Sequence, residues 1–185
     1  ACSARIEGGA LVVESPSDPA TGLAKTLIVA PAPGGFRIAH RLANEGPFLA
    51  PPAAIWGLTC VRPAGVCAFP WRSGPERWSV ASLKIWAAWA DHGSNLESPQ
   101  WVPTNDLFEA HPTGEEGKAG TFADRGWIAQ WTGEATFVKQ SMPRRDAQYP
   151  DGGCNLEMYT CGHFIEMETL SPLATLGPGE TLEHE

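Results

Sequence analysis

The sequence predicts an all-β protein built from antiparallel sheets packed as a sandwich. Short runs of β-branched, aromatic and aliphatic residues alternate with turn signals along the chain, and almost no stretch repeats with a helical period. The 20 glycines and 17 prolines would divide any helix into short strands and turns. With 185 residues, 43% of them hydrophobic, the chain can bury one core, and we expect a single domain over residues 1–185.

The expected strands follow one another with few interruptions, and "SLKIWAAWA" at 82–90 fits either a helix or a strand. Residues 91–118 show little regular pattern, and we expect a long loop there, of the kind that is usually functional. The expected strands and hairpins lie within 10–15, 24–31, 34–44, 54–61, 65–71, 126–142, 156–169 and 173–185.

Charge and cysteine content exclude several classes of protein. A net charge of -8, a pI near 5.1 and the lack of a basic stripe argue against a nucleic-acid or anionic-membrane partner. No apolar run is long enough to span a bilayer, so we expect a soluble protein, either cytoplasmic or exported. The five cysteines lack metal-site spacing, and we expect free thiols and no metal or cofactor, with a Cys60–Cys67 disulfide as the alternative.

One predicted hairpin carries an unusual set of carboxylates. In "CNLEMYTCGHFIEMETL", residues 154–170, polar and apolar residues alternate on both sides of Cys161-Gly162, where glycine can take the positive φ of a two-residue turn. That turn would place Glu157 opposite Glu166. The polar face carries Asn155, Glu157, Tyr159, Phe164, Glu166 and Glu168. The other face, which we expect in a core, carries Leu156, Met158, Ile165 and Met167.

Opposed carboxylates need an explanation. The Cβ atoms of Glu157 and Glu166 would lie about 5 Å apart, and like charges in that position destabilise a sheet. A cation, a shared proton or a bound ligand relieves the repulsion. Two interpretations stay open: a solvated face screened by Lys or Arg from a neighbouring strand, and a functional face that uses the carboxylates.

Four segments in order resemble a bacterial family within the galactose mutarotase-like, or aldose 1-epimerase-like, superfamily. They are "FRIAHRLANEGPFLAPPAAIWGLTCV", "GKAGTFADRGWIAQWTGEATFVK", "YPDGGCNLEMYT" and "FIEMETLSPLATLGPGETLEHE", within residues 36–185. "LGPGET" is similar to the L-A-P-G-E turn that precedes the last strand in many aldose 1-epimerases. The resemblance implies a β-supersandwich, with large antiparallel sheets curved around a sugar-binding groove. It also implies further N-terminal strands, so that this chain would be the later part of a longer product.

The resemblance also implies catalytic roles. Mutarotases open and reclose a pyranose ring, with a glutamate that takes the proton of the anomeric hydroxyl and a histidine that protonates the ring oxygen. The position of this glutamate matches Glu166, and Glu168, the next residue on the same face of the strand, is the alternative. The histidine does not transfer, because Trp56 stands in its place. The candidate catalytic residues are therefore Glu157, Glu166, Glu168, His40 and His163.

A sugar-binding groove needs flat apolar surfaces for pyranose rings and planar polar groups for hydroxyls. Arg72 and Lys118 could bind the carboxylate or phosphate of an acidic sugar, or could neutralise Glu157 and Glu166 instead. The candidate binding residues are Trp56, Trp71, Arg72, Lys118, Trp127, Tyr149 and Asn155.

The sequence thus predicts a carbohydrate-active protein of mutarotase type whose glutamates could interconvert the anomers of a bound sugar. The main alternative is a non-catalytic carbohydrate-binding domain. A polysaccharide lyase and a structural or assembly domain are further alternatives. The expected partner is a carbohydrate, and open sheet edges would invite a homo-oligomer or pairing with the missing N-terminal strands.

Overall fold

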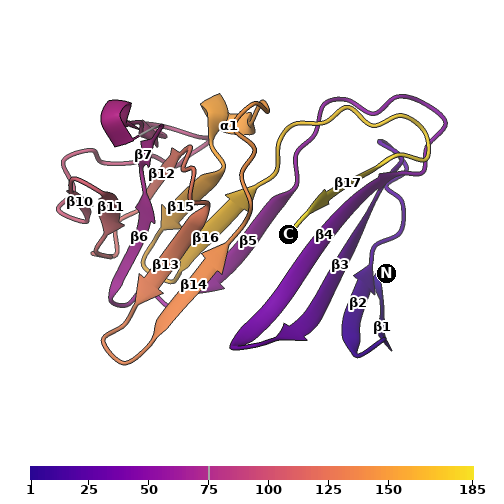
Figure 1. The fold of residues 1–185 in the computed structure, drawn as a ribbon, viewed down its shortest axis with the longest axis horizontal. Coiled ribbons are helices and arrows are strands. Elements are labelled where there is room, and N and C mark those ends of the chain that lie inside the picture. The colour runs from indigo at the N-terminus through magenta and orange to yellow at the C-terminus, as the bar shows by residue number, and fades with distance from the viewer. Residues whose placement is uncertain (75) are drawn as a thin grey trace. The chain divides into compact units, whose positions relative to one another are not determined.

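The structure, a computed structural model, describes residues 1–74 and 76–185 and is almost entirely β (Figure 1). Three five-stranded sheets and one two-stranded sheet are formed, and every pair of strands in them is antiparallel. This confirms the predicted all-β, antiparallel class. By contacts the chain forms two compact units, Trp56–Leu170 and Ala1–Ile55 with Ser171–Glu185. One domain over the whole chain stays a prediction.

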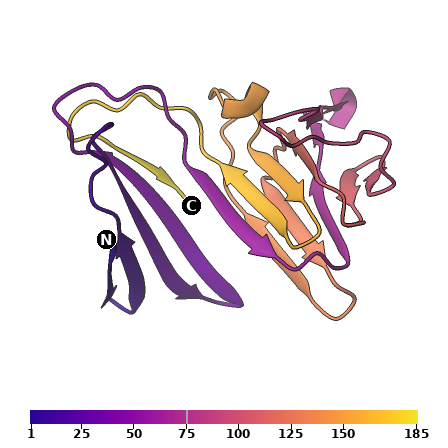
Figure 2. The same cartoon turned by 180° about the vertical axis from the view of Figure 1, so that it is seen from behind.

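The smaller unit contains one sheet with the strand order β1-β2-β3-β4-β17, whose strands are drawn in indigo to purple, with β17 in yellow, in Figure 2. These strands are β1 (Ser3–Glu7), β2 (Ala10–Glu14), β3 (Leu23–Ala32), β4 (Gly35–Asn44) and β17 (Thr181–His184). All were expected except β1, which is exposed along its whole length and so lacks an apolar alternation to reveal it. Leu42, Ala50, Ile55 and Leu176 form this unit's small core.

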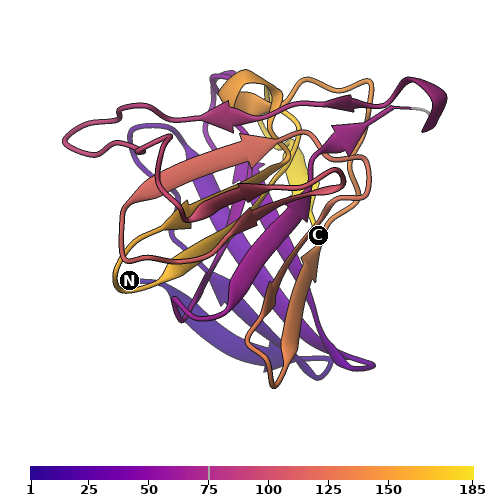
Figure 3. The same cartoon turned by 90° about the vertical axis from the view of Figure 1, so that its left-hand side faces the viewer.

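The larger unit is a sandwich of two five-stranded sheets. The carboxylate sheet, named for its glutamates, has the order β5-β16-β15-β12-β9. Its strands are β5 (Trp56–Val61), β16 (Ile165–Leu170), β15 (Leu156–Thr160), β12 (Gly117–Thr121) and β9 (Lys84–Ile85). The backing sheet has the order β10-β11-β6-β13-β14, and Figure 3 shows β13 and β14 (orange) beside β6. Its strands are β10 (Trp101–Pro103), β11 (Leu107–Ala110), β6 (Val66–Pro70), β13 (Trp127–Trp131) and β14 (Thr136–Gln140).

The core of this unit lies between the two sheets. Alternation along each strand sends every second side chain inward, so β15 and β16 contribute Met158 and Met167, which are fully buried. Phe69 and Phe108 of the backing sheet stack on each other with 5.6 Å between ring centroids. The predicted core face of the hairpin is confirmed, since all four of its apolar residues belong to this core. The opposite face of the carboxylate sheet is therefore left to the polar side chains.

Short elements complete the larger unit. They are the β7–β8 ladder (Arg72–Ser73 and Val80–Ala81), the 3-10 turn η1 (Glu76–Trp78) and the single helical turn α1 (Pro150–Gly153). No helix within the described residues has the length and apolar character needed to cross a membrane.

Two stretches differ from the sequence expectation. The stretch 82–90 is not a helix, because only β9 is regular there and Trp89 forms a β-bridge with His92. Residues 91–118 are not an irregular loop, because β10, β11 and the start of β12 lie within them. These strands are short, three to five residues each, which is why the sequence shows little periodic signal for them.

The register of the predicted hairpin is wrong by two residues. Glu157 pairs with Glu168, and Tyr159 pairs with Glu166. The turn is Gly162-His163, closed by a hydrogen bond of 3.1 Å from the Cys161 amide to the Phe164 carbonyl. Gly162 does not have a positive φ, so the turn chemistry that favoured Cys161-Gly162 does not apply. The two faces are nevertheless as expected, because a shift of two residues preserves the alternation.

All five cysteines are free. Cys60 is exposed on β5 of the carboxylate sheet, whereas Cys67 is buried in the core from β6 of the backing sheet. The alternative Cys60–Cys67 disulfide is therefore wrong. Burial raises the pKa of the Cys67 thiol to about 12, which keeps it protonated and unreactive.

Candidate functional site

Two rows of residues cross the polar face of the carboxylate sheet, and the strand register defines them. Residues directly opposite each other across neighbouring strands point to the same face. The first row is Leu58, Glu168, Glu157, Gly120 and Lys84. The second row is Cys60, Glu166, Tyr159 and Lys118. The fold thus gathers three glutamates and two lysines on one surface.

Lys118 joins the two rows by reaching diagonally to both glutamates of the first. Its Nζ atom lies 2.8 Å from Oε2 of Glu157 and 2.9 Å from Oε2 of Glu168. The Glu157 side chain is 1% exposed and that of Glu168 is 0% exposed, against 15% for Lys118. These three side chains are here called the buried ion cluster. They support the interpretation that Lys118 neutralises carboxylates of the hairpin, but its second partner is Glu168 and not the expected Glu166.

Gly120 makes room for the buried ion cluster. It lies opposite Glu157 in the first row, and a Cβ atom on Gly120 would lie 2.8 Å from Cγ of Glu157 and 3.0 Å from Sγ of Cys154. Real Cβ atoms do not approach so closely, so a larger residue would displace the Glu157 side chain. A glycine at this position therefore lets the glutamate lie flat against the sheet.

Two tryptophans cover the Lys118 ammonium. It lies 5.0 Å from the ring centroid of Trp56 and 5.3 Å from that of Trp86. Cation–π attraction at these distances stabilises the charge. The indole N–H of Trp56 also donates to Oε2 of Glu168 at 2.8 Å, which fixes the ring. Trp56 is nevertheless 53% exposed, so much of its surface remains free to contact a ligand.

Burial sets the protonation of the buried ion cluster. It raises the pKa of Glu157 to about 8, against the opposing effect of Lys118 and with the support of the nearby Glu168 carboxylate. For Lys118, burial works against the charge, but the Glu168 and Glu157 carboxylates outweigh it and raise the pKa. At neutral pH one proton on Glu157 makes the cluster of one cation and two carboxyl groups neutral overall. Oε1 of each glutamate has no hydrogen-bond partner, so the pair is not fully satisfied.

Glu166 is the more accessible glutamate on this face. It is half-buried, next to Tyr159 on β15 and Cys60 on β5. Burial, followed by the charge of Glu168, raises the pKa of Glu166 above its usual range. Its carboxyl group has no ion pair within the described part of the chain, in contrast to Glu157 and Glu168. Glu166 is therefore the one of these three glutamates whose side chain is partly accessible from solvent.

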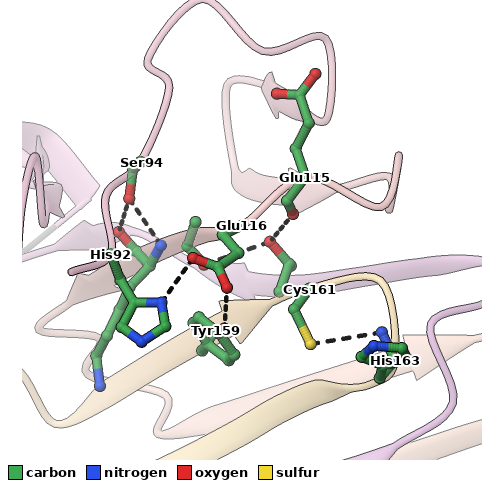
Figure 4. Close-up of polar contacts among 10 residues, drawn as sticks. His92, Ser94, Glu115, Glu116, Tyr159, Cys161 and His163 are labelled. Atoms are coloured by element: carbon green, nitrogen blue, oxygen red, sulfur yellow. Dashed lines mark hydrogen bonds and ion pairs between the residues drawn. The ribbon is translucent and has the colours of Figure 1, made fainter.

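A second polar group, here called the histidine cluster, consists of His92, Glu116, Tyr159 and Trp89, and Figure 4 shows the first three of these residues. Tyr159 belongs to the second row as well. Glu116, just before β12, contacts two partners at once: Nδ1 of His92 lies 2.8 Å from its Oε2, and the Tyr159 hydroxyl donates to its Oε1 at 3.3 Å. Trp89 stacks on the His92 ring and meets the Tyr159 ring edge-on, at centroid distances of 5.8 and 6.1 Å.

A tight turn holds His92 in this position. Trp89 and His92 exchange backbone hydrogen bonds of 2.9 and 2.8 Å across Ala90-Asp91. Ala90 takes a φ of 49°, a left-handed conformation that costs an ordinary residue about 1–2 kcal/mol. The chain therefore adopts an unfavourable backbone conformation at the residue that brings Trp89 and His92 together.

The structure brings together five of the residues proposed from the sequence: Trp56, Lys118, Glu157, Glu166 and Glu168. It places Asn155 in the interior, where its amide exchanges hydrogen bonds of 2.8 and 2.9 Å with the backbone of Ala123. His163 is exposed in the hairpin turn (Figure 4). His40 lies on β4 of the smaller unit, opposite His184.

The remaining candidates belong to other surroundings. The Trp71 indole donates to the Thr104 carbonyl and its ring packs on Phe108 of the core. Arg72 pairs with Asp106. Trp127 neighbours the core residue Ile128 on β13, so it points to the outer face of the backing sheet. Tyr149 is buried, and its hydroxyl accepts the Arg144 amide hydrogen at 2.8 Å.

Sequence reasoning missed Trp86, Trp89, His92 and Glu116. The first three lie in 82–92, where no periodic pattern predicts which way a side chain points. The sequence did carry one signal for these residues: two tryptophans and a histidine lie within the seven residues 86–92. Among the described residues, no group of three or more His, Cys, Asp or Glu side chains has the arrangement of a metal site.

Comparison with known proteins defines the class of fold. No protein-family model and no curated protein gives a significant match to the sequence. A galactose mutarotase-like protein from Lactobacillus casei ATCC 334 is similar in structure, with a TM-score of 0.62 over 98% of this chain and 70% of its own, at 11% sequence identity. The fold is therefore an antiparallel β-sandwich of the galactose mutarotase-like type.

A second solved structure is more distant. The Slr1438 protein from Synechocystis sp. PCC 6803 aligns with 99% of this chain and 63% of its own, with a TM-score of 0.39 and 12% identity. This chain therefore spans less than two thirds of that protein. The fold assignment rests on the protein from Lactobacillus casei alone.

Proposed function

We propose that the polar face of the carboxylate sheet binds a carbohydrate ring. The observation that carries the proposal is the half-exposed Glu166 carboxyl group on a surface that also holds the Trp56 and Tyr159 rings. Aromatic rings beside a planar polar group suit a pyranose, which has apolar C–H faces and paired hydroxyls at its edge. The similarity in fold to a galactose mutarotase-like protein from Lactobacillus casei adds support.

The charges favour a neutral sugar over an acidic one. Lys118 is engaged by two carboxyl groups, Arg72 is paired with Asp106, and Lys84 on β9 lies three strands away from Glu166 on β16. None of these three cations is therefore free next to Glu166 for a uronate or a phosphate. Glu166 adds a negative charge to the same face when it is ionised. We therefore propose an uncharged reducing sugar as the ligand.

Anomer interconversion is the activity that fits this face best. Glu166 would take the proton of the anomeric hydroxyl, and its raised pKa, caused by burial and by the charge of Glu168, strengthens it as a base. Glu157 and Glu168 are buried under Lys118 and would hold the surface in place instead. Among the three glutamates first considered, this assigns the chemistry to Glu166 alone.

A proton NMR time course of α-to-β interconversion of glucose and galactose tests the activity. Wild type should accelerate the approach to equilibrium, and Glu166→Gln should reduce that acceleration by about 100-fold or more, because a general base is lost. Glu134→Gln, a change in the exposed turn before β14, is the matched control and should leave the rate unchanged. Equal rates for wild type and Glu166→Gln would contradict the assignment.

A non-catalytic carbohydrate-binding surface is the second candidate. One observation in its favour is that Glu157 and Glu168 form ion pairs with Lys118 and are not available for catalysis. Another is that Trp56 stands at the position where the resemblance to mutarotases implies a histidine. Trp56→Ala should raise the Kd for the sugar by about 3- to 10-fold, since a ring stacking contact is lost. Trp131→Ala is the matched control, because Trp131 is 57% exposed on the backing sheet. Tryptophan fluorescence titration measures both, and equal effects would contradict the proposed surface.

A further inference from the structure

The histidine cluster has the geometry of a positioned acid–base group. Glu116 binds the His92 ring through Nδ1, so in the neutral ring Nδ1 carries the hydrogen and Nε2 carries the lone pair. Nε2 has no hydrogen-bond partner among the described residues, and the side chain is 47% exposed. A carboxylate on one nitrogen and an open site at the other is the arrangement that lets an imidazole exchange a proton with a ligand.

The cluster is also held rigidly, which separates it from an ordinary surface ion pair. Glu116 is fixed at its other oxygen by the Tyr159 hydroxyl, and Trp89 touches both the His92 and Tyr159 rings. His111 offers an instructive contrast in the same chain: its Nε2 lies 2.9 Å from Glu109, but no third polar side chain completes that pair among the described residues. Only the histidine cluster therefore has a second hydrogen bond that orients the carboxylate.

The cluster adjoins the surface proposed to bind sugar. Tyr159 is directly opposite Glu166 on β16 and directly opposite Lys118 on β12. Opposed residues in a sheet have Cβ atoms about 5 Å apart. Glu166 thus lies on one side of Tyr159, and Glu116 with His92 lies at its hydroxyl end. A ring about the size of a pyranose, lying on Tyr159, would have a carboxylate at one edge and an imidazole at another.

We propose that His92 is the residue that protonates the ring oxygen of the bound sugar, and that Glu116 and Tyr159 are positioning residues that hold its ring for this transfer. The inference rests on the proposed sugar site at Glu166. It assigns the acid to a residue other than the two histidines, His40 and His163, that were considered from the sequence.

The proton balance of the step is complete with these two residues. Glu166 takes the proton from the anomeric hydroxyl, the C1–O1 bond becomes a carbonyl, and the bond from C1 to the ring oxygen breaks. The electron pair of that bond goes to the ring oxygen, which takes the proton from Nε2 of the His92 imidazolium. Rotation about C1–C2 and the reverse transfers reclose the ring as the other anomer and restore both residues.

The test compares His92→Gln with His111→Gln as its matched control, in the full chain. His92→Gln should lower the first-order rate of interconversion by about 10²- to 10⁴-fold, because a general acid is lost. The Kd for glucose should change by less than about twofold, since the side chain acts on the transition state. His111→Gln should match wild type in both measurements, and a similar loss of rate in this control would overturn the proposal.

The pH profile gives a readout that a structural role would not change. The groups facing His92 are Glu116 and Tyr159, and Asp91 precedes it in the turn. The pH–rate profile of His92→Gln should differ in shape from that of wild type, because the variant has no acid at this position, whereas His111→Gln should keep the wild-type profile. A His92→Gln profile with the wild-type shape would overturn the proposal.

For the positioning residues, nitrogen-15 NMR of the sugar-free protein reports the His92 tautomer directly. The Nδ1–H form should dominate in wild type and its share should fall in Glu116→Ala, which removes the acceptor, with a smaller fall in rate than in His92→Gln. An unchanged rate in His92→Gln beside a lost rate in Glu166→Gln would overturn the role of His92 and leave the proposed function standing. Absence of both sugar binding and acceleration in wild type would overturn the two together.

Discussion

The polar face of the carboxylate sheet contains two sets of acidic groups in two different environments. Glu157 and Glu168 are buried beneath Lys118 and the two tryptophans that cover it. Glu166 and Glu116 are half-exposed on the same surface. Lys118 supplies the cation for the buried pair, so the charges of that pair are balanced without a ligand. The two half-exposed groups have no lysine or arginine ion-pair partner: Glu116 contacts His92 and Tyr159 instead, and Glu166 remains accessible. Burial therefore separates a structural role from a chemical one among residues of the same type.

Removal of Lys118 should have the largest effect on this contrast. Lys118→Met leaves two buried carboxyl groups without a cation, and we expect a loss of about 3–5 kcal/mol in the free energy of unfolding at pH 7. Arg72→Met breaks an exposed pair with Asp106 and should cost less than about 1 kcal/mol. Urea denaturation measures both, and equal losses would show that the buried ion cluster is no more important than a surface pair.

Gly120→Ala should have an intermediate effect. The new methyl group would overlap Cγ of Glu157 at 2.8 Å and the Leu156 carbonyl oxygen at 3.1 Å, and overpacking of this kind costs about 1–3 kcal/mol. Gly162→Ala is the matched control on the same hairpin, because its Cβ would meet only the Gly114 carbonyl oxygen, at 3.5 Å. It should change stability by less than about 0.5 kcal/mol. A large loss in Gly162→Ala would mean that the turn does require a positive φ.

The titration of Glu157 should change the free energy of unfolding by the smallest amount, counted per pH unit. Because burial raises the Glu157 pKa from 4.5 to about 8, the folded chain binds this proton more tightly than the unfolded chain does. The contribution of Glu157 is thus complete below about pH 4.5 and is lost as the pH rises through about 8, by at most about 1.4 kcal/mol per pH unit.

Glu157→Gln should remove this pH-dependent contribution, because the amide does not titrate. Thermal or urea unfolding of wild type and variant between pH 5 and pH 8 measures the difference. A wild type that gains stability relative to Glu157→Gln as the pH rises would contradict a protonated Glu157 in the buried cluster.

The hairpin shows how far sequence reasoning reaches. Its faces followed from the period-two alternation, which any shift of two residues preserves. The opposing pair did not follow, because Gly162 does not adopt the positive φ assumed for it, and the turn closes from Cys161 to Phe164 instead. As a result Glu168, rather than Glu166, faces Glu157. Alternation is a local property, whereas register depends on how the turn closes.

Some residues of the candidate site could be predicted from the sequence and others could not. Lys118 was recognised as a cation able to neutralise the glutamates, because an acidic face in a sheet requires one. Trp86, Trp89 and His92 were not recognised, because they lie in a segment held by isolated backbone hydrogen bonds and one β-bridge instead of a long strand. Such a segment leaves no periodic signal in the sequence.

The sequence by itself determined the antiparallel β class, the core face of the hairpin and the gathering of carboxylates on its other face. These features follow from alternation and turn residues, which act over a few neighbouring positions. Only the tertiary structure decided that Glu157 and Glu168 are buried under Lys118, that Glu166 stays accessible, and that Glu116 joins His92 to Tyr159. Those contacts join strands and loops distant in the sequence, and they form only when the whole sheet is assembled.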